Sequence, residues 1–131
     1  MISQERLKHL NKLSETIIGA AIEVHKFLGP GLLESVYDIC LIEELEQRGL
    51  TVQQQVHLPL YYKGQLTNKF FVIDLLIENE VILELKAVDR LLPVHEHQLM
   101  TYLKLTQMNL GLLINFNVPR LVDGIKRRVN G

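Results

Sequence analysis

The sequence lacks features that would assign it to several common protein classes. It has a single cysteine, Cys40, which cannot form a disulfide within the chain and falls in a helical pattern where a small buried hydrophobic side chain is expected. No run of residues has the length and freedom from charge that a membrane span requires. Residues 1–9 are charged where a signal peptide would need a basic start followed by an apolar run. We therefore expect a cytoplasmic protein without redox chemistry.

The sequence also lacks an excess of charge of either sign. Fourteen basic and fifteen acidic residues give a net charge of −1, so the whole molecule should exert no long-range attraction on nucleic acid. The one local basic cluster, Lys126-Arg127-Arg128, is interpreted as a solvated chain end, with phosphate contact as the alternative. A hydrophobic fraction of 47% is ordinary for a globular protein. The length predicts one domain, residues 1–131.

The first part of the chain has the periodicity of helices. From Glu5 to Leu28, apolar residues recur at intervals of three and four, which predicts one long helix or two shorter ones broken near Ser14. Gly29-Pro30-Gly31 should end this segment, because proline disfavours helical geometry in the preceding residue and glycine readily adopts a left-handed conformation. A second helix is expected from about Leu33, with Gly49 as its terminating glycine.

Beyond Leu50 the period changes to two, as in strands. Thr51–Val56 and Leu58–Tyr62 are predicted as two short strands, followed by a turn at Lys63-Gly64-Gln65. Pro59 favours an edge or the start of a strand, since proline cannot donate to a ladder.

The remaining elements complete an α/β pattern. Phe70–Ile77 and Val81–Lys86 are almost continuously apolar, so both faces of these strands should be covered. A third helix is expected from about His95 to Thr106, and Leu110–Phe116 is predicted as the last buried strand. Helices on both sides of a short mixed sheet are the simplest packing of these elements.

Two acids and a lysine fall on one face of the predicted hairpin. If its loop is Glu78–Glu80, symmetric pairing places Asp74 opposite Glu84, and alternation by two places Lys86 on the same face. Like charges in directly opposed positions are destabilising, so at least one carboxylate should have a raised pKa without metal. A hard divalent cation such as Mg²⁺ would offset the repulsion. The alternative is a solvated or ion-paired hairpin, which the apolar neighbours disfavour.

The same residues resemble a known signature. Asp74 followed by Glu84-Leu85-Lys86 resembles the D…(D/E)xK signature of the PD-(D/E)XK nucleases, restriction-endonuclease-like enzymes that hydrolyse phosphodiesters. Ile73 stands where the superfamily name has proline. Gln98-Leu99-Met100-Thr101-Tyr102 is similar to the QxxxY motif of RecB-type members.

A further motif is similar to one small family within that superfamily. Gly31-Leu32-Leu33-Glu34-Ser35-Val36-Tyr37 resembles the GxxExxY motif that gives the family its name. The similarity runs from about Ile17 to Arg128. It implies a restriction-endonuclease-like core and metal-dependent hydrolysis of nucleic acid, with DNA before RNA as the expected substrate.

The resemblance also implies roles for individual residues. Asp74 and Glu84 would hold Mg²⁺ or Mn²⁺, with Glu34 completing the acidic site from the second helix. Lys86 would position and polarise the attacking water. The candidate residues that would orient Lys86 or the scissile phosphate are Gln98 and Tyr102.

Other interpretations remain open from the sequence. A non-catalytic nucleic-acid-binding or protein-interaction module could have kept the nuclease fold, and a purely structural domain would have the acids facing solvent. His25 has apolar neighbours and is expected in the core or at its rim, and no zinc-binding pattern is present. A nuclease this small would bury little DNA surface as a monomer, which leaves a homodimer as an open alternative.

Overall fold

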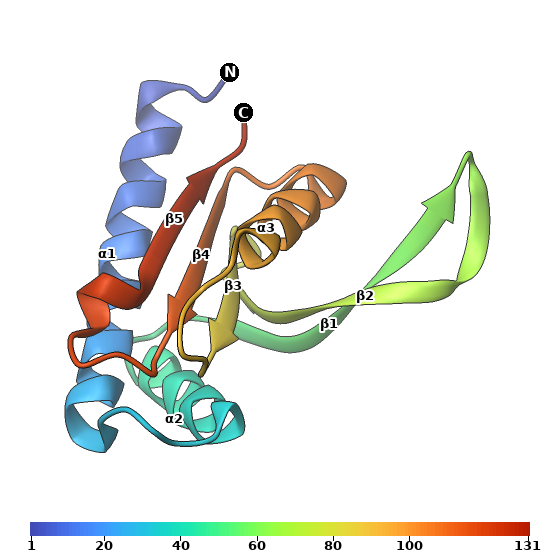
Figure 1. Ribbon diagram of the computed structural model, residues 1–131. Helices are drawn as coiled ribbons and strands as arrows, with labels where there is room; N and C mark the ends of the chain where they lie inside the picture. Colours follow the sequence, from blue (N-terminus) through green and yellow to red (C-terminus); the bar gives the residue numbers. More distant parts are fainter.

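The computed structural model describes residues 1–131 as a five-stranded mixed sheet flanked by three helices (Figure 1). The strands lie side by side in chain order; β3 and β4 are parallel, and every other neighbouring pair is antiparallel. The predicted α/β fold is confirmed. The elements are α1 (Gln4–Leu28), α2 (Glu34–Gln47), β1 (Val52–Tyr62), β2 (Gln65–Ile77), β3 (Val81–Lys86), α3 (Pro93–Thr106), β4 (Leu110–Asn115), the short 3-10 helix η1 (Leu121–Gly124) and β5 (Ile125–Val129).

The two faces of the sheet bury separate hydrophobic clusters. On one face α1 and α2 share the larger cluster with β2, β3 and β4, whereas α3 closes a smaller cluster on the other face. Strand β3 serves both, since Leu83 belongs to the larger cluster and Ile82 to the smaller one. This two-sided burial explains why the sequence of β3 is almost continuously apolar. No helix combines the length and apolar character that crossing a membrane would require.

Helix α1 is continuous, so of the two alternatives the break near Ser14 is wrong. Ser14 is itself buried in the face of α1 that packs on the sheet. The Ser3 side chain accepts a hydrogen bond from the backbone N–H of Arg6 at the start of the helix, and Gly29, with φ of 74°, follows its end. His25 is buried, with Nε2 2.8 Å from the Val118 carbonyl oxygen, which confirms its place at the core.

Strands β1 and β2 form a longer hairpin than the sequence indicated. The stretches predicted as two short strands form a single strand, β1, which begins at Val52 and not at Thr51, so the prediction of two strands is wrong. β1 is at one edge of the sheet, which agrees with Pro59. The far end of the hairpin, residues 57–70, extends well away from the rest of the molecule (Figure 1). We call this segment the arm.

A two-residue turn closes the arm. Lys63 and Gly64 have φ values of 49° and 80°, and positive φ at both central residues is the requirement of the tight hairpin turn whose twist matches the flanking strands. Lysine tolerates this conformation less readily than glycine, so Gly64 is the residue that favours the turn most.

The sheet has a fifth strand that the sequence pattern did not indicate. β4 is the last buried strand, as predicted, but β5 pairs antiparallel with it and forms the other, exposed edge of the sheet. Lys126-Arg127-Arg128 lies within β5 and is not merely a solvated chain end. Arg128 forms an ion pair with Glu96 of α3, and Arg127 donates a hydrogen bond to Asn11 of α1. Basic side chains at an edge also discourage pairing with strands of other molecules.

The close packing of η1 under the end of β4 generates a prediction about stability. A Cβ atom at Gly124 would collide with the Asn115 carbonyl oxygen and lie 3.0 Å from Val118 Cγ2. Gly124→Ala should therefore lower the free energy of unfolding by about 1–3 kcal/mol, the usual cost of overpacking. Urea denaturation of the purified variant measures this.

Gly19→Ala is the matched control for that substitution. In the interior of α1 the new Cβ would meet only the flexible end of Arg48, at 3.4 Å, and alanine is favoured over glycine in a helix by about 0.5–1 kcal/mol. The free energy of unfolding should rise. Equal changes in both variants would contradict the packing described around Gly124.

Candidate active site

The β2–β3 ladder opens at Asp74 and Glu84. Beyond the last regular pair, Glu84 Oε2 accepts a hydrogen bond from the backbone N–H of Asp74 at 2.8 Å, and Asp74 Oδ2 accepts one from the backbone N–H of Leu85, also at 2.8 Å. Each carboxyl group thus satisfies a backbone donor of the opposite strand. The predicted register is confirmed for the three pairs nearest the loop, which are Ile77–Val81, Leu76–Ile82 and Leu75–Leu83.

The regular alternation assumed from the sequence fails at Asp74. Ile73 and Leu76 both belong to the smaller cluster although they are three residues apart, which strict alternation does not allow. The β1–β2 pairing skips the same position, because Gln55, which stands opposite Asp74, has a positive φ of 51°. Asp74 therefore lies at an irregularity in both of the ladders that flank β2, and its side chain reaches the backbone of Leu85 and the cavity described below.

Burial changes the acidity of both members of this pair, and the charge of Asp74 adds to the effect on Glu84. Glu84 is only 3% exposed; its burial, and next the charge of Asp74, raise the pKa of Glu84 to about 8, against an ordinary value of 4.5. Burial also raises the pKa of Asp74, opposed by the hydrogen bond from Leu85 and the charge of Lys86. The expected rise in pKa of at least one carboxylate is confirmed. At neutral pH the folded Glu84 consequently keeps a proton.

Helix α2 adds two more acids beside this pair. A cavity of about 300 Å³ separates the start of α2 from β2 and β3; it is lined by Glu34, Ser35, Asp38, Gln55, Asp74 and Leu85. Partial burial raises the pKa of the Glu34 carboxyl, with smaller contributions from the charges of Asp74 and Asp38. Glu34 thus joins the acidic group at the exposed mouth of the cavity, as the motif resemblance implied.

Asp38 is a member of the group that sequence reasoning missed. Burial, and then the charge of Asp74, raise the pKa of its carboxyl. Its Oδ1 atom is buried without a hydrogen-bond partner, which is rare for a carboxylate oxygen. The signal that could have found it is its spacing from Glu34, since residues four apart share one face of a helix.

Tyr37 fixes the loop from which Glu34 extends. The fully buried Tyr37 hydroxyl donates a hydrogen bond to the Gly29 carbonyl oxygen at 2.6 Å and accepts one from the Leu32 N–H at 3.1 Å. Its ring stacks on Phe116, with ring centroids 4.5 Å apart. The tyrosine of the GxxExxY-like segment therefore anchors the turn before α2 to the end of β4, and so sets the position of Glu34 as the first residue of α2.

Lys86 ends β3 close to the carboxylates. Its charge lowers the pKa of each acid nearest the opening of the ladder, namely Glu34, Asp74 and Glu84. A single ammonium group thus acts on all three carboxylates. The structure in this way brings together Lys86 and three carboxylates, four of the six residues that the sequence singled out, and Tyr102 of α3, described below, is the fifth.

Asn115 of β4 holds the backbone just beyond Lys86. The Asn115 side chain accepts a hydrogen bond from the Val88 N–H at 3.0 Å and donates one to the Val88 carbonyl oxygen at 2.9 Å. The Phe116 N–H donates to the Lys86 carbonyl oxygen at 2.9 Å. No sequence pattern indicated this role, because an asparagine at the end of an apolar strand looks like the first residue of a loop.

Helix α3 brings Tyr102 to the site but leaves Gln98 at the surface. Tyr102 is 3% exposed, and its burial, followed by the charges of Glu84 and Asp74, raises the pKa of its hydroxyl to about 12. Gln98 is exposed. His95, on the same helical stripe, uses Nδ1 to accept a hydrogen bond from the Leu92 N–H at 3.0 Å and so caps the helix. Tyr102 stays protonated and able to donate.

The acidic group fits a hard divalent cation by its chemistry. Its donors are carboxylate oxygens, one of them the orphaned Oδ1 of Asp38, and no Cys or His side chain that zinc would prefer lines the cavity. No three His, Cys, Asp or Glu side chains are grouped as the ligands of one ion. Mg²⁺ nevertheless keeps several waters and uses only one or two protein carboxylates, so Asp74 and Glu84 are sufficient in number.

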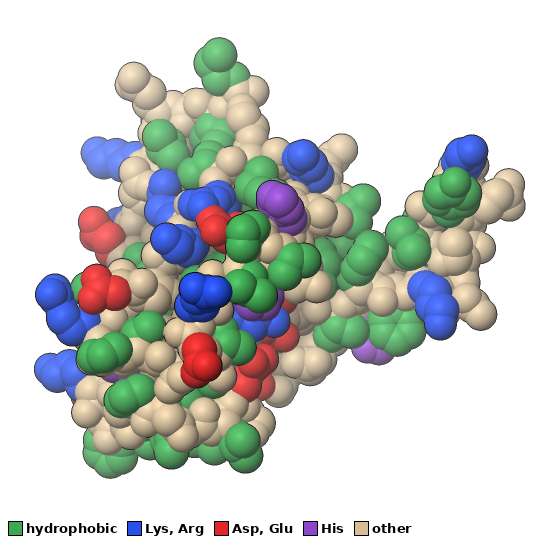
Figure 2. Space-filling model, viewed as in Figure 1, with side chains coloured by type: hydrophobic (Ala, Val, Ile, Leu, Met, Phe, Trp, Pro, Cys, Tyr) green, Lys and Arg blue, Asp and Glu red, His purple; other side chains and the backbone are tan.

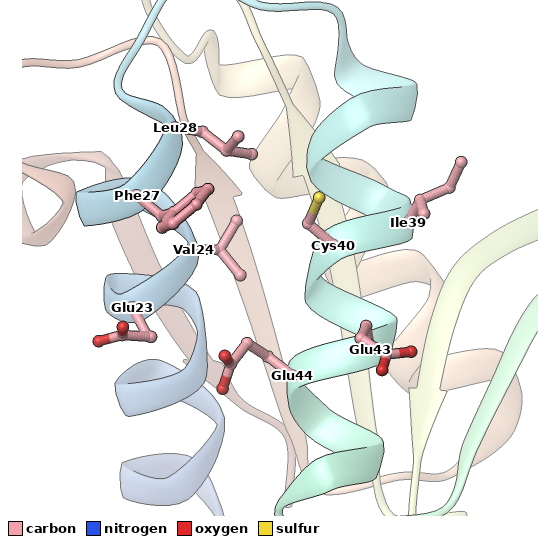
Figure 3. Close-up of a pocket in the computed structure, with 8 residues that line it drawn as sticks. All are labelled: Glu23, Val24, Phe27, Leu28, Ile39, Cys40, Glu43 and Glu44. Atoms are coloured by element: carbon pink, nitrogen blue, oxygen red, sulfur yellow. The ribbon is translucent and has the colours of Figure 1, made fainter.

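A second cavity, of about 390 Å³, lies between α1 and α2 (Figure 3). Val24 and Leu28 of α1 point toward Cys40 of α2 there, with glutamates along the edge. Cys40 is partly exposed and not buried as the sequence suggested. None of the residues that line this cavity also lines the acidic one, so it is separate from the candidate active site.

The raised pKa of Glu84 predicts how stability depends on pH. Between pH 4.5 and about 8 the unfolded chain has released the Glu84 proton while the folded protein retains it. The free energy of unfolding should therefore fall as the pH rises through this window, by up to about 1.4 kcal/mol per unit from this group. Glu84→Gln keeps a neutral side chain of the same shape, so its stability should depend less on pH. Urea denaturation at closely spaced pH values measures both slopes.

The exposed Glu46 provides a matched control. Glu46→Gln removes a carboxylate from the surface of α2 and should leave the wild-type slope unchanged. If Glu84→Gln also kept that slope, the carboxyl of Glu84 would titrate as an ordinary glutamate and its burial beside Asp74 would be wrong.

Comparison with known proteins agrees with this geometry. A family model described as the PD-(D/E)XK nuclease superfamily matches residues 11–128, which include every element from most of α1 to most of β5. Searches against curated proteins and against solved structures found no match. The mixed sheet, with acids at the end of its central hairpin, is consistent with the matched family. The chain belongs to the PD-(D/E)XK nuclease superfamily.

Proposed function

We propose that this protein is a metal-dependent nuclease that hydrolyses phosphodiester bonds of DNA, or of RNA. The observation that carries the proposal is the reciprocal hydrogen bonding of Asp74 and Glu84 at the opening of the β2–β3 ladder. Two neighbouring carboxyl groups, each bonded to the backbone of the opposite strand and both with raised pKa, form a site that a cation would stabilise. In a chain of this superfamily, such a site is best explained by catalysis on phosphates.

Asp74 and Glu84 are the residues that would hold Mg²⁺ or Mn²⁺, and Glu34 would complete the acidic set from α2. When bound, the cation supplies Lewis acidity for phosphodiester hydrolysis. Because Glu84 retains a proton at neutral pH, metal binding would have to release that proton. Affinity for the cation should therefore increase with pH.

The polar residues around the acids have complementary roles in this proposal. The ammonium group of Lys86 positions and polarises the attacking water. Tyr102, which stays a hydrogen-bond donor because its pKa is about 12, orients Lys86 or the scissile phosphate. Gln98 is exposed at the other end of the same helical stripe, where it would meet the phosphate of a bound substrate.

We further propose membership of the GxxExxY family within the superfamily. The three named positions of that motif have distinct physical roles here. Gly31 has a φ of 92° in the turn before α2, Glu34 begins the helix beside the acids, and Tyr37 ties the turn to β4. We expect the enzyme to act in the cytoplasm.

The first test separates metal binding from the rest of the site. Asp74→Ala should abolish Mg²⁺ or Mn²⁺ binding and cleavage together, since the substitution removes both a ligand and the charge that attracts the cation. Isothermal titration calorimetry with Mn²⁺ and a cleavage assay on single-stranded and duplex DNA and RNA measure the two effects. Glu46→Ala, at an exposed acid of α2, is the control and should behave as the wild type.

Lys86→Ala should separate binding from chemistry. Removing a positive charge beside the acids should leave cation affinity equal or higher, while cleavage falls by a factor on the order of 10²–10⁴, as for other positioned proton-transfer or electrostatic groups. Lys104→Ala, at an exposed lysine of α3, should change neither quantity. Gln98→Ala should reduce cleavage by less than Lys86→Ala does, without loss of metal.

Two results would overturn the proposal. A wild-type protein that binds the cation but cleaves none of these nucleic acids would be a binding module that keeps the nuclease fold. A wild-type protein that binds no divalent cation would leave the hairpin with a structural role alone.

A further inference from the structure

The arm begins at the candidate active site. Gln55 of β1 and Asp74 of β2 both line the acidic cavity, and the same two strands continue outward as residues 57–70 (Figure 1). No residue of the arm is buried. A two-stranded ribbon that projects from the body in this way contributes little to the core. Its length is therefore not explained by a contribution to stability.

One face of the arm is an exposed apolar surface. Pro59 pairs with Phe70 and Tyr61 with Leu66, and the register shifts between these two pairs because β2 has extra residues there. β1 itself is continuous through this stretch, so its alternation places these four side chains on the same face. Tyr61, Leu66 and Phe70 are 61%, 63% and 54% exposed. The ring of His57 stacks on Phe70, with centroids 4.4 Å apart, and extends the surface toward the body.

The arm carries positive charge in a protein whose net charge is −1. No acidic residue stands between Glu46 and Asp74, whereas Lys63 lies in the turn at the tip, with its ammonium group 5.5 Å from the centroid of the Tyr62 ring, and Lys69 is next to Phe70. Figure 2 shows basic and hydrophobic side chains on the projecting segment, with none of the acidic ones seen on the body. The surface therefore complements a partner that combines flat apolar groups with negative charge.

We propose that the arm binds single-stranded nucleic acid and directs it to Asp74 and Glu84. Unpaired bases stack on Tyr61 and Phe70, and Lys63 and Lys69 contact phosphates. This inference rests on the proposed nuclease function and specifies its substrate class. Aromatic side chains along a positive strand or groove are the common way in which proteins hold single strands without reading their sequence. In a duplex the base faces are already stacked and cannot receive these rings.

Charge decides between this partner and a second copy of the chain. If two arms packed symmetrically, their apolar faces would be covered, but four lysines would be brought together with no acid on either arm to neutralise them. A polyanion, in contrast, is attracted electrostatically by the same lysines. The observations therefore favour nucleic acid.

Fluorescence anisotropy of a labelled oligothymidylate, and of an oligouridylate, tests the proposal with the full-length protein. The buffer contains EDTA, so the readout depends on neither metal nor cleavage. Tyr61→Ala and Phe70→Ala should each weaken binding roughly 5- to 150-fold, the range expected when one base stack is removed. Phe27→Ala, which removes an aromatic ring 87% exposed on α1, is the matched control and should keep the wild-type affinity.

The salt dependence tests the two lysines independently of the rings. With Lys63→Ala and Lys69→Ala combined, the slope of log affinity against log salt should become less steep by about 1.4, which is roughly 0.7 for each phosphate that the protein no longer neutralises. Both positions are exposed in the arm, so the folded body should be unaffected. The circular dichroism spectrum and the urea midpoint of the double variant should therefore equal those of the wild type.

Three results would overturn the arm proposal. They are an unchanged affinity in Tyr61→Ala and Phe70→Ala, a wild-type preference for duplex over single strand, and a wild-type dimer in sedimentation that these substitutions dissociate without affecting nucleic-acid binding. The last would identify a second copy as the partner. Cleavage by the wild type with added metal is measured separately. If the wild type cleaves nucleic acid but the arm variants bind it as well as the wild type does, only the arm proposal is refuted. If binding depends on the arm but the wild type does not cleave, only the proposed nuclease activity is refuted.

Discussion

Two carboxyl groups that accept hydrogen bonds across the β2–β3 hairpin are the constraint on which this structure depends. Asp74 and Glu84 each satisfy a backbone N–H that the opening of the ladder would leave unpaired, and a buried donor without a partner costs about 1–3 kcal/mol. The side chains thereby allow β2 to separate from β3 and continue beside β1 into the arm. The acidic site and the arm are two results of the same break in the sheet, and both occur where Gln55 leaves the regular strand conformation.

Much of this arrangement follows from short-range patterns. The three-residue loop between two apolar runs fixes the register of the three pairs nearest it. Extending that register was enough to predict that Asp74 lies near Glu84, although hydrogen bonds from their side chains to the backbone, and not ladder pairing, join them. Helical periodicity and the glycines after each helix locate α1 and α2 to within a few residues. The resemblance of Gly31–Tyr37 to a motif selected Glu34, which the structure places beside the hairpin, although only packing shows that Tyr37 acts by fixing the turn. Local geometry and motif were sufficient for these features because each involves residues close in the chain.

The features that could not be predicted depend on contacts between distant segments. Asp38 looked like one more acid on a helix surface, and its orphaned oxygen exists only because α2 packs against β2. Asn115 acquires its role from the parallel pairing of β4 with β3. The strand character of β5 was hidden by three consecutive basic residues, whose edge position is set by the neighbouring strand and not by their own propensity. Alternation failed at Asp74 for a related reason. The conformation of this residue depends on the pairing of β2 with both β1 and β3, and both ladders are interrupted there.

The surroundings of the carboxyl pair also determine when the site can exist during folding. The hairpin bonds join residues only ten and eleven positions apart, yet the burial that weakens Glu84 as an acid depends on α3 and β4, which follow in the chain. On a ribosome the hairpin emerges before these elements, with both acids hydrated, ionised and repelling each other. Its loop end can pair early, whereas its acidic end gains its hydrogen bonds only after the later segments cover it. A partly synthesised chain therefore has the acids in sequence but not the organised site.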